Sequence, residues 1–278
     1  MSQKRFSLVR TLGIIFMLTY IIFIAFPIYW QLNTSFKEIG EVRKIPPTFF
    51  PKHFTLSPYV NVMSNPMARK SIYDSLIISI TTTLLSVLIG SLAGYAFARY
   101  PKYAGGENLS FWMLSVRMFP PIVFILPFFF IFNNLGLTDT YFSLIVMYFT
   151  FNLPLSVWLM MMFFGDVPRE LEEAAYVDGY KPFKAFFKVT LPLVLPGMVS
   201  VIMLCWIFAW NEFLFANVLV GTRVKTFPLV IPTFASGSSI LWNQVMAFTV
   251  IAMLPPIILF IFLRKYMIRG LSLGVVKG

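Results

Sequence analysis

Long apolar stretches separated by shorter polar segments dominate this sequence. Each stretch holds about 20 mostly apolar residues, which is the length that a helix needs to cross a bilayer. The stretches lie at 12–30, 72–98, 109–132, 141–164, 193–220 and 241–263. The pattern therefore predicts an all-α membrane protein with six transmembrane helices.

Composition supports a membrane protein over a soluble one. Hydrophobic residues make up 58% of the chain and charged residues 12%, against about 25% charged residues in ordinary soluble domains. Lys4, Arg5 and Arg10 imitate the start of a cleaved signal peptide. The apolar stretch that follows is too long and lacks a small-residue cleavage site, so we expect an uncleaved start-transfer anchor.

The net charge of +11 is distributed as membrane topology requires. In a six-helix arrangement with both termini cytoplasmic, the cytoplasmic segments hold 13 Lys and Arg residues and the outer segments hold eight, six of them in the first outer loop. An excess of positive charge on the cytoplasmic side is typical of membrane proteins. The charge therefore indicates orientation, and no nucleic-acid partner is expected.

Few residues are suited to catalysis or metal binding. The chain has one cysteine, Cys205, and one histidine, His53, so disulfides and clustered metal ligands are excluded. No Gly-x4-Gly-Lys-Ser/Thr phosphate loop occurs in the sequence. The chain is therefore not expected to be an enzyme or to hydrolyse ATP by itself.

The polar segment 166–190 between the fourth and fifth stretches is longer than a turn requires. Asp166 is a suitable N-cap with Pro168 in the first turn, so a short helix is predicted to begin there. Gly179 offers a left-handed position at which that helix would end. Carboxylates near the helix start suit the positive end of its dipole: Glu170, Glu172 and Glu173.

Helical spacing divides this segment into faces. The first helix is predicted to place on one face Leu171, Ala174, Ala175 and Asp178. After Pro182, a second amphipathic helix is predicted to set Phe183, Phe186 and Phe187 opposite Lys181, Lys184 and Lys188. Without a motif, this pattern would equally suit a surface helix that lies on lipid headgroups.

A longer motif runs through the same segment. Glu173-Ala174-Ala175 is followed after three residues by Gly179, and after nine more by Val189-Thr190-Leu191-Pro192. This spacing resembles the EAA loop of binding-protein-dependent ABC importer permeases, with Val189 where Ile is usual. Further segments resemble the sugar-uptake branch of that family, and within it the shorter permease of the maltose-type pair: Arg117 to Pro121, Asp178-Gly179, Trp210 to Phe213 and the terminal Val276-Lys277-Gly278.

The resemblance implies a type I ABC importer permease fold in the cell (inner) membrane. Residues 1–70 would form an N-terminal transmembrane anchor and the first outer loop, and 71–264 the transmembrane core. The cytoplasmic EAA coupling loop would lie at 166–190, and a cytoplasmic tail at 265–278. In that family the EAA loop seats in a groove of the ATPase, so the predicted ATPase-coupling residues are Leu171, Glu173, Ala174, Ala175, Asp178 and Gly179. The tail residues Gly274, Lys277 and Gly278 are predicted to contact the ATPase as well.

Partners follow from the same resemblance. It implies a second homologous permease, two copies of a cytoplasmic ATPase that binds ATP and Mg²⁺, an extracytoplasmic solute-binding protein and a sugar or oligosaccharide substrate. No cofactor is expected in this chain. The implied mechanism is alternating access driven by closure of the ATPase dimer.

Polar residues inside the apolar stretches are candidates for a substrate pathway. Arg117 lies about 12 Å into its predicted helix, and a charge at that depth faces a bundle interior or a wet cavity. It could contact a sugar, or it could bind carbonyl groups that Pro120 and Pro121 leave without donors. Further candidates are Asn152, Trp210, Asn211 and Glu212.

One position departs from the family pattern. Asp74 stands where the family usually has Asn before Ser-Leu, which puts in doubt any hydrogen-bonding role assigned to that Asn. Two other classes remain as alternatives. An ion-coupled transporter would need several intramembrane carboxylates or histidines, and Glu212 is nearly alone. A membrane enzyme would need a nucleophile and base that the sequence does not show.

Overall fold

The structure is a computed structural model that describes residues 2–235 and 240–273. Within these ranges the chain forms helices and connecting segments, with no β-strand. They divide into two compact units. The first contains the chain up to Arg69 and Val230–Met253, and the second contains Lys70–Leu229 and the chain from Leu254 onward.

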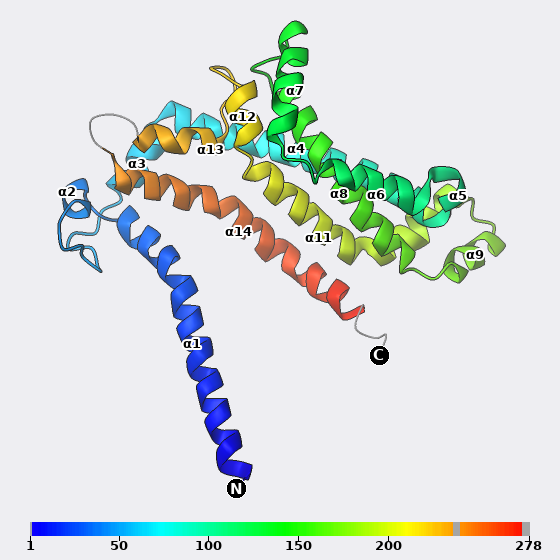
Figure 1. The fold of residues 1–278 in the computed structure, drawn as a ribbon, viewed down its shortest axis with the longest axis horizontal. Helices are drawn as coiled ribbons and strands as arrows, with labels where there is room; N and C mark the ends of the chain where they lie inside the picture. Colours follow the sequence, from blue (N-terminus) through cyan, green and yellow to red (C-terminus); the bar gives the residue numbers. More distant parts are fainter. Residues whose placement is uncertain (1, 236–239, 274–278) are drawn as a thin grey trace. The chain divides into compact units, whose positions relative to one another are not determined.

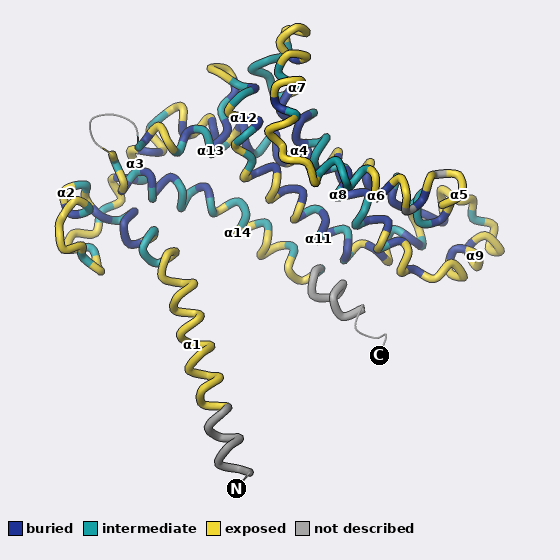
Figure 2. The backbone as a smooth tube through the Cα atoms, in the orientation of Figure 1, coloured by how far each residue is buried: buried dark blue, intermediate teal, exposed yellow. Residues whose placement is uncertain are grey.

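The first unit contains the N-terminal helix and the long loop that follows it. Its helices are α1 Ser2–Ser35, α2 Ile39–Val42, α3 Ser57–Ser64, the 3-10 helix η2 Ile231–Ala235 and the first part of α14 Trp242–Leu273. Buried polar groups hold the loop together, because Asn243 Nδ2 donates to the Lys37 carbonyl oxygen (3.0 Å) and Thr48 Oγ1 donates to the Glu41 carboxylate (2.6 Å). By contrast, α1 is exposed along residues 10–28, as Figure 2 shows. Such an apolar helix suits contact with lipid or another membrane subunit.

The second unit is a helical bundle. Its elements are α4 Pro66–Arg99, which begins in the first unit, α5 Pro101–Ala104, α6 Gly106–Val116, α7 Ile122–Asn134, α8 Tyr141–Gly165, α9 Glu170–Val177, α10 Pro182–Ala185, the π-helix η1 Phe186–Thr190, α11 Leu191–Trp210, α12 Leu214–Leu219, α13 Phe227–Val230 and the end of α14. Within it, α8 and α11 lie side by side, and α6 packs along α8 (Figure 1).

Two apolar clusters form the core of the bundle. One gathers α7, α8 and α12 around Leu144, Met147 and Phe215. The other gathers α8, η1 and α11 around Met160, Phe164 and Phe186. Since Leu144 and Phe164 lie near opposite ends of α8, the bundle has a packed core at each end.

Five of the six predicted stretches contain a helix that is long and apolar enough to cross a membrane. The third, 109–132, is instead built from α6 and α7 with a break at residues 117–121. Pro120 and Pro121 lack the N–H groups that a continuous helix needs. Six continuous spanning helices are therefore not confirmed, and the cytoplasmic location of both termini stays a prediction.

The fifth stretch is also interrupted, near its end. The helix α11 ends at Trp210, and α12 begins at Leu214. The Glu212 carboxylate accepts hydrogen bonds from the backbone N–H groups of Phe215 (2.9 Å) and Ala216 (3.2 Å). Glu212 was predicted to lie within a spanning helix, but it caps the start of a new short one, as carboxylates at helix N-termini do.

Candidate functional site

The predicted coupling segment forms the helix α9 and an ordered turn after it. The helix begins at Glu170, whereas Asp166 ends α8, so the predicted N-cap at Asp166 is wrong. Pro168 disfavours helical backbone at the residue before it, and this separates the two helices. The acidic first turn of α9 is present as predicted, with Glu170, Glu172 and Glu173.

The predicted stop at Gly179 is confirmed by its backbone. Gly179 has a φ of +81°. Its N–H donates to the Tyr176 carbonyl oxygen (3.0 Å), and the Tyr180 N–H donates to that of Ala175 (2.9 Å). This pair of bonds is the Schellman motif, which needs a left-handed residue at the position of Gly179. The turn therefore fixes the direction in which the chain leaves α9.

The predicted face of α9 is divided between core and surface. Ala175 is buried, whereas Leu171, Glu173, Ala174 and Asp178 are exposed. The exposed residues leave a surface available to another protein, and the side chain next to it, Val177, is 89% exposed.

After Gly179, the second predicted helix is part of a longer one. The elements α10, η1 and α11 continue into each other, so residues 182–210 form one candidate spanning helix. Phe186 is buried, whereas Phe183 and Phe187 are exposed, so the three rings do not share one environment. Pro192 has no N–H to offer the Lys188 carbonyl oxygen, and at this point Leu191 N–H donates to Phe186 O in the wider π turn.

Glu172 is a functional candidate that the sequence alone did not single out, because its only predicted role was to lie near the positive end of the helix dipole. Its side chain is buried and accepts three side-chain hydrogen bonds, which come from Arg99 Nε (2.8 Å), Tyr95 Oη (3.0 Å) and Thr190 Oγ1 (2.8 Å). Three glutamates within four residues do not reveal which of them points inward, because that depends on the elements packed against α9. The donors lie 73, 77 and 18 residues away in sequence.

Arg117 ends α6 at the break before α7. Its Nη1 donates to the Phe151 carbonyl oxygen on α8 (3.0 Å), and its guanidinium lies 4.2 Å from the centre of the Phe208 ring on α11. The acceptor is thus on a neighbouring helix and not among the carbonyl groups upstream of Pro120. These contacts tie α6 to α8 and α11 through an acceptor that neither alternative for Arg117 named.

A cavity of about 240 Å³ lies beside Arg117. Its lining includes Tyr148, Asn152 and Glu212, together with the rings of Phe151 and Phe208. Asn152 is buried, and its Nδ2 donates to the Cys205 carbonyl oxygen (3.2 Å). The structure therefore brings together three of the five predicted pathway residues: Arg117, Asn152 and Glu212.

The other two predicted pathway residues lie elsewhere. Trp210 is buried. It stacks on Trp206, with a centroid distance of 5.0 Å, and packs at a tilt against Phe227, with a centroid distance of 4.7 Å. Its ring faces are used for packing, so it is not available to stack on a sugar. Asn211 is exposed, and its Nδ2 donates to the Ile207 carbonyl oxygen (2.9 Å). The tail candidates Gly274, Lys277 and Gly278 lie outside the described residues.

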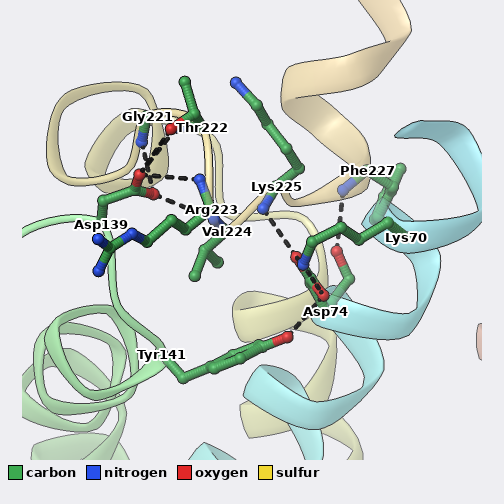
Figure 3. Close-up of polar contacts among 11 residues, drawn as sticks. Lys70, Asp74, Asp139, Tyr141, Gly221, Thr222, Arg223, Val224, Lys225 and Phe227 are labelled. Atoms are coloured by element: carbon green, nitrogen blue, oxygen red, sulfur yellow. Dashed lines mark hydrogen bonds and ion pairs between the residues drawn. The ribbon is translucent and has the colours of Figure 1, made fainter. Parts of the chain in front are cut away.

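Two carboxylates organise the end of the bundle opposite α9 (Figure 3). The sequence alone did not connect them with each other. Asp139 lies between α7 and α8 in the left-handed region, with φ of +58°. Its carboxylate accepts from four successive backbone N–H groups, at 2.8–3.0 Å: Gly221, Thr222, Arg223 and Val224. Burial raises the pKa of Asp139, but the four donors outweigh it and hold that pKa well below its ordinary value.

Asp74 is the second of these carboxylates and is fully buried. It accepts from Lys70 Nζ (2.7 Å), Tyr141 Oη (2.7 Å) and Lys225 N (2.8 Å). An Asn at this position would present an NH₂ group to one of these donors. An Asp at position 74, in place of the family's usual Asn, therefore suits a site in which all three neighbouring groups are donors.

Comparison with known proteins places the chain in a family. Residues 86–273 match the family described as "Binding-protein-dependent transport system inner membrane component". The chain is 35% identical over 273 residues to the trehalose/maltose transport system permease protein MalG of Thermococcus litoralis, with 97% of each chain covered. It is 33% identical over 255 residues to the trehalose transport system permease protein SugB of Mycobacterium tuberculosis, covering 91% of this chain and 92% of that one.

A solved structure shows the same fold. One chain of a bacterial ABC transporter involved in the import of the acidic polysaccharide alginate superposes with a TM-score of 0.76 at 21% identity, covering 95% of this chain and 97% of that one. The present chain belongs to the family of inner membrane components of binding-protein-dependent transport systems. It is a membrane-embedded ABC transporter permease with the type I importer fold.

Proposed function

We propose that this chain is one permease subunit of an ATP-driven importer for a sugar or oligosaccharide, and that α9 is the helix through which a separate ATPase drives it. The observation that carries the proposal is the geometry of α9. It is a short helix with an acidic first turn, a fixed Schellman stop at Gly179 and an exposed edge at Leu171, Glu173 and Ala174. A simple connection between two spanning helices would not need such a structure.

The sugar substrate is supported by the relatives. Both permeases named above belong to systems named for trehalose or maltose. In this chain, the cavity beside Arg117 offers a guanidinium, an amide, a phenol and aromatic rings, groups that suit a hydroxylated ligand. At about 240 Å³ it is smaller than the roughly 300 Å³ at which ligand pockets usually begin. We infer that a second homologous permease completes the pathway.

The same argument extends to the other partners. A binding-protein-dependent system includes an extracytoplasmic protein that delivers the solute, and ATP with Mg²⁺ would bind to two copies of a cytoplasmic ATPase. With the α9 segment in the cytoplasm, both termini would also be cytoplasmic. In this arrangement Arg117 has first a structural role, because it joins α6 to α8 and α11.

The proposal is tested by transport in proteoliposomes. The complex is purified through a tag on this chain, reconstituted with its binding protein and ATP, and assayed with radiolabelled trehalose, maltose and uronic-acid oligosaccharides. We expect ATP-dependent uptake that persists when a proton uncoupler is present. Uptake that requires an ion gradient and proceeds without ATP would instead support an ion-coupled transporter.

Gly179→Val tests the role of α9 in the same assay. A β-branched residue at φ of +81° is strained, typically by about 1–3 kcal/mol, although no atom lies within 4 Å of the position that its Cβ would occupy. We expect uptake to fall at least tenfold. Gly165→Val is the matched control, because Gly165 also faces open space but has ordinary helical backbone. Equal uptake by the two variants would contradict the assignment of α9.

A further inference from the structure

Glu172 differs from every other carboxylate of α9 in the direction of its side chain. Glu170 and Glu173 are exposed, whereas Glu172 is 4% exposed. Its Oε1 receives Arg99 Nε (2.8 Å) and Thr190 Oγ1 (2.8 Å), and its Oε2 receives Tyr95 Oη (3.0 Å). The helix α9 thus has an outer side, available to a partner, and an inner side that ends in one buried anion.

The donors to this anion belong to the two helices that flank α9. Tyr95 and Arg99 lie in the last two turns of α4, and Thr190 is the last residue of the π segment before α11. Arg99 is 8% exposed and also donates, through Nη2, to the Val167 carbonyl oxygen after α8 (2.9 Å). One ion pair therefore connects α9 with the ends of α4, α8 and α11.

The surroundings make this connection stiff. The Tyr95 ring packs edge-on against Phe164 and Phe186, with centroid distances of 5.4 and 4.7 Å. One residue earlier, Gly94 lets α4 press against α8, because a Cβ there would lie 2.7 Å from Met161 N. Removed from water, the ion pair is both stronger and more directional than a surface pair. A displacement of α9 is therefore passed to α4 and is not absorbed by loose side chains.

The helix α4 can carry such a displacement across the bundle. Tyr95 lies 21 residues after Asp74, a distance of about 30 Å along a helix axis, which equals the thickness of the hydrocarbon layer. At that far end, Asp74 binds Tyr141 at the start of α8 and the backbone of Lys225. Buried carboxylates thus fasten α4 at both ends.

We propose that the buried Glu172–Arg99 pair is the link that converts a displacement of α9 into movement of α4 and α11, and hence into opening of the transport pathway. Glu172 and Arg99 are positioning residues in this scheme and contact neither sugar nor ATP. The exposed edge of α9 formed by Leu171, Glu173 and Ala174 receives the force, and the buried pair transmits it. This inference rests on the proposed function, in which a separate ATPase moves α9.

The experiment compares transport efficiency in three variants of the reconstituted complex: Glu172→Gln, the double variant Glu172→Gln with Arg99→Met, and the control Glu170→Gln. The same preparations are assayed for ATP hydrolysis, thermal unfolding and sugar uptake. The sugar is the one that gives the highest uptake in the transport assay proposed above. Glu170 is the matched control because it is an exposed carboxylate on the same helix.

For Glu172→Gln we expect sugar transported per ATP hydrolysed to fall about tenfold, while hydrolysis stays within about twofold of wild type. The double variant removes the unpaired buried cation, so its unfolding temperature should recover towards wild type. Its transport per ATP should nevertheless stay low, because the link is still missing. Glu170→Gln should match wild type in every measurement.

Two other results have distinct meanings. If uptake and hydrolysis fall in proportion in Glu172→Gln and both return in the double variant, the pair serves stability alone and the link is overturned. If the wild-type complex contains no ATPase and shows no ATP-dependent uptake, the proposed function itself fails, independently of Glu172.

Discussion

The two ends of α4 are fastened by buried carboxylates in different ways. At the α9 end, Glu172 receives only side-chain donors, and one of them is the cation Arg99. At the α12 end, Asp74 receives a mixture of side-chain and backbone donors, while the half-buried Asp139 between α7 and α8 receives four backbone N–H groups of segment 221–224. A side-chain donor can change its rotamer or be replaced by mutation, whereas a backbone donor cannot.

This difference suits different tasks. Backbone donors hold the segment 221–224 in one shape whatever its side chains are, so the α12 end has a loop of defined geometry. At the α9 end, the same carboxylate chemistry depends on one charge pair between elements far apart in sequence. We therefore expect the α9 end to be the more sensitive to substitution.

Glu172→Ala is expected to have the largest effect. It leaves the buried Arg99 guanidinium with the Val167 carbonyl oxygen but without its counter-ion. Removing one partner of a buried pair typically costs about 3–5 kcal/mol. Thermal unfolding of the purified complex would measure this loss, and Glu173→Ala serves as the control for stability because that side chain is exposed. Equal unfolding temperatures in the two variants would contradict the comparison.

Asp74→Asn is expected to have an intermediate effect of about 1–3 kcal/mol, the typical cost of leaving a buried polar group unsatisfied. The amide can still accept from Tyr141 or from the backbone of Lys225, but its NH₂ group meets a donor. The thermal unfolding temperature of this variant should lie between those of the wild type and of Glu172→Ala. Wild-type stability would show that the surrounding donors rearrange without cost.

Asp139→Ala is expected to have the smallest effect, about 1 kcal/mol, because Gly221, Thr222 and Arg223 are exposed and water can replace the carboxylate. The stabilisation that Asp139 contributes should depend on pH. The folded-state pKa of Asp139 is lowered, so its contribution is complete above the unfolded-state pKa of about 3.9 and is lost as pH falls towards the lower folded-state value.

The wild type and the Asp139→Ala variant should therefore differ in unfolding temperature at pH 7, and the difference should shrink below about pH 4. Asp166→Asn provides a control, since Asp166 is exposed and ends α8 at the opposite end of the bundle. A difference that stays constant with pH would mean that the Asp139 carboxylate does not carry the effect.

Much of this protein was determined by short-range pattern. The apolar stretches predicted the helices, since an uninterrupted run of about 20 apolar residues has few other stable forms in a membrane. The Glu-Ala-Ala to Leu-Pro spacing predicted the family, which the matched relatives confirm. The helix stop at Gly179 followed from the residue itself, because glycine readily adopts the left-handed backbone that ends a helix.

What the sequence could not decide was which polar residues meet. Arg117 was known to need an acceptor, but the acceptor is Phe151 on another helix. Three glutamates within four residues were predicted to begin α9, but only packing against α4 and η1 turned Glu172 inward. Partners such as Arg99 and Glu172 are 73 residues apart, and no local propensity links them. Their meeting depends on how the long helices cross, which only the tertiary structure decides.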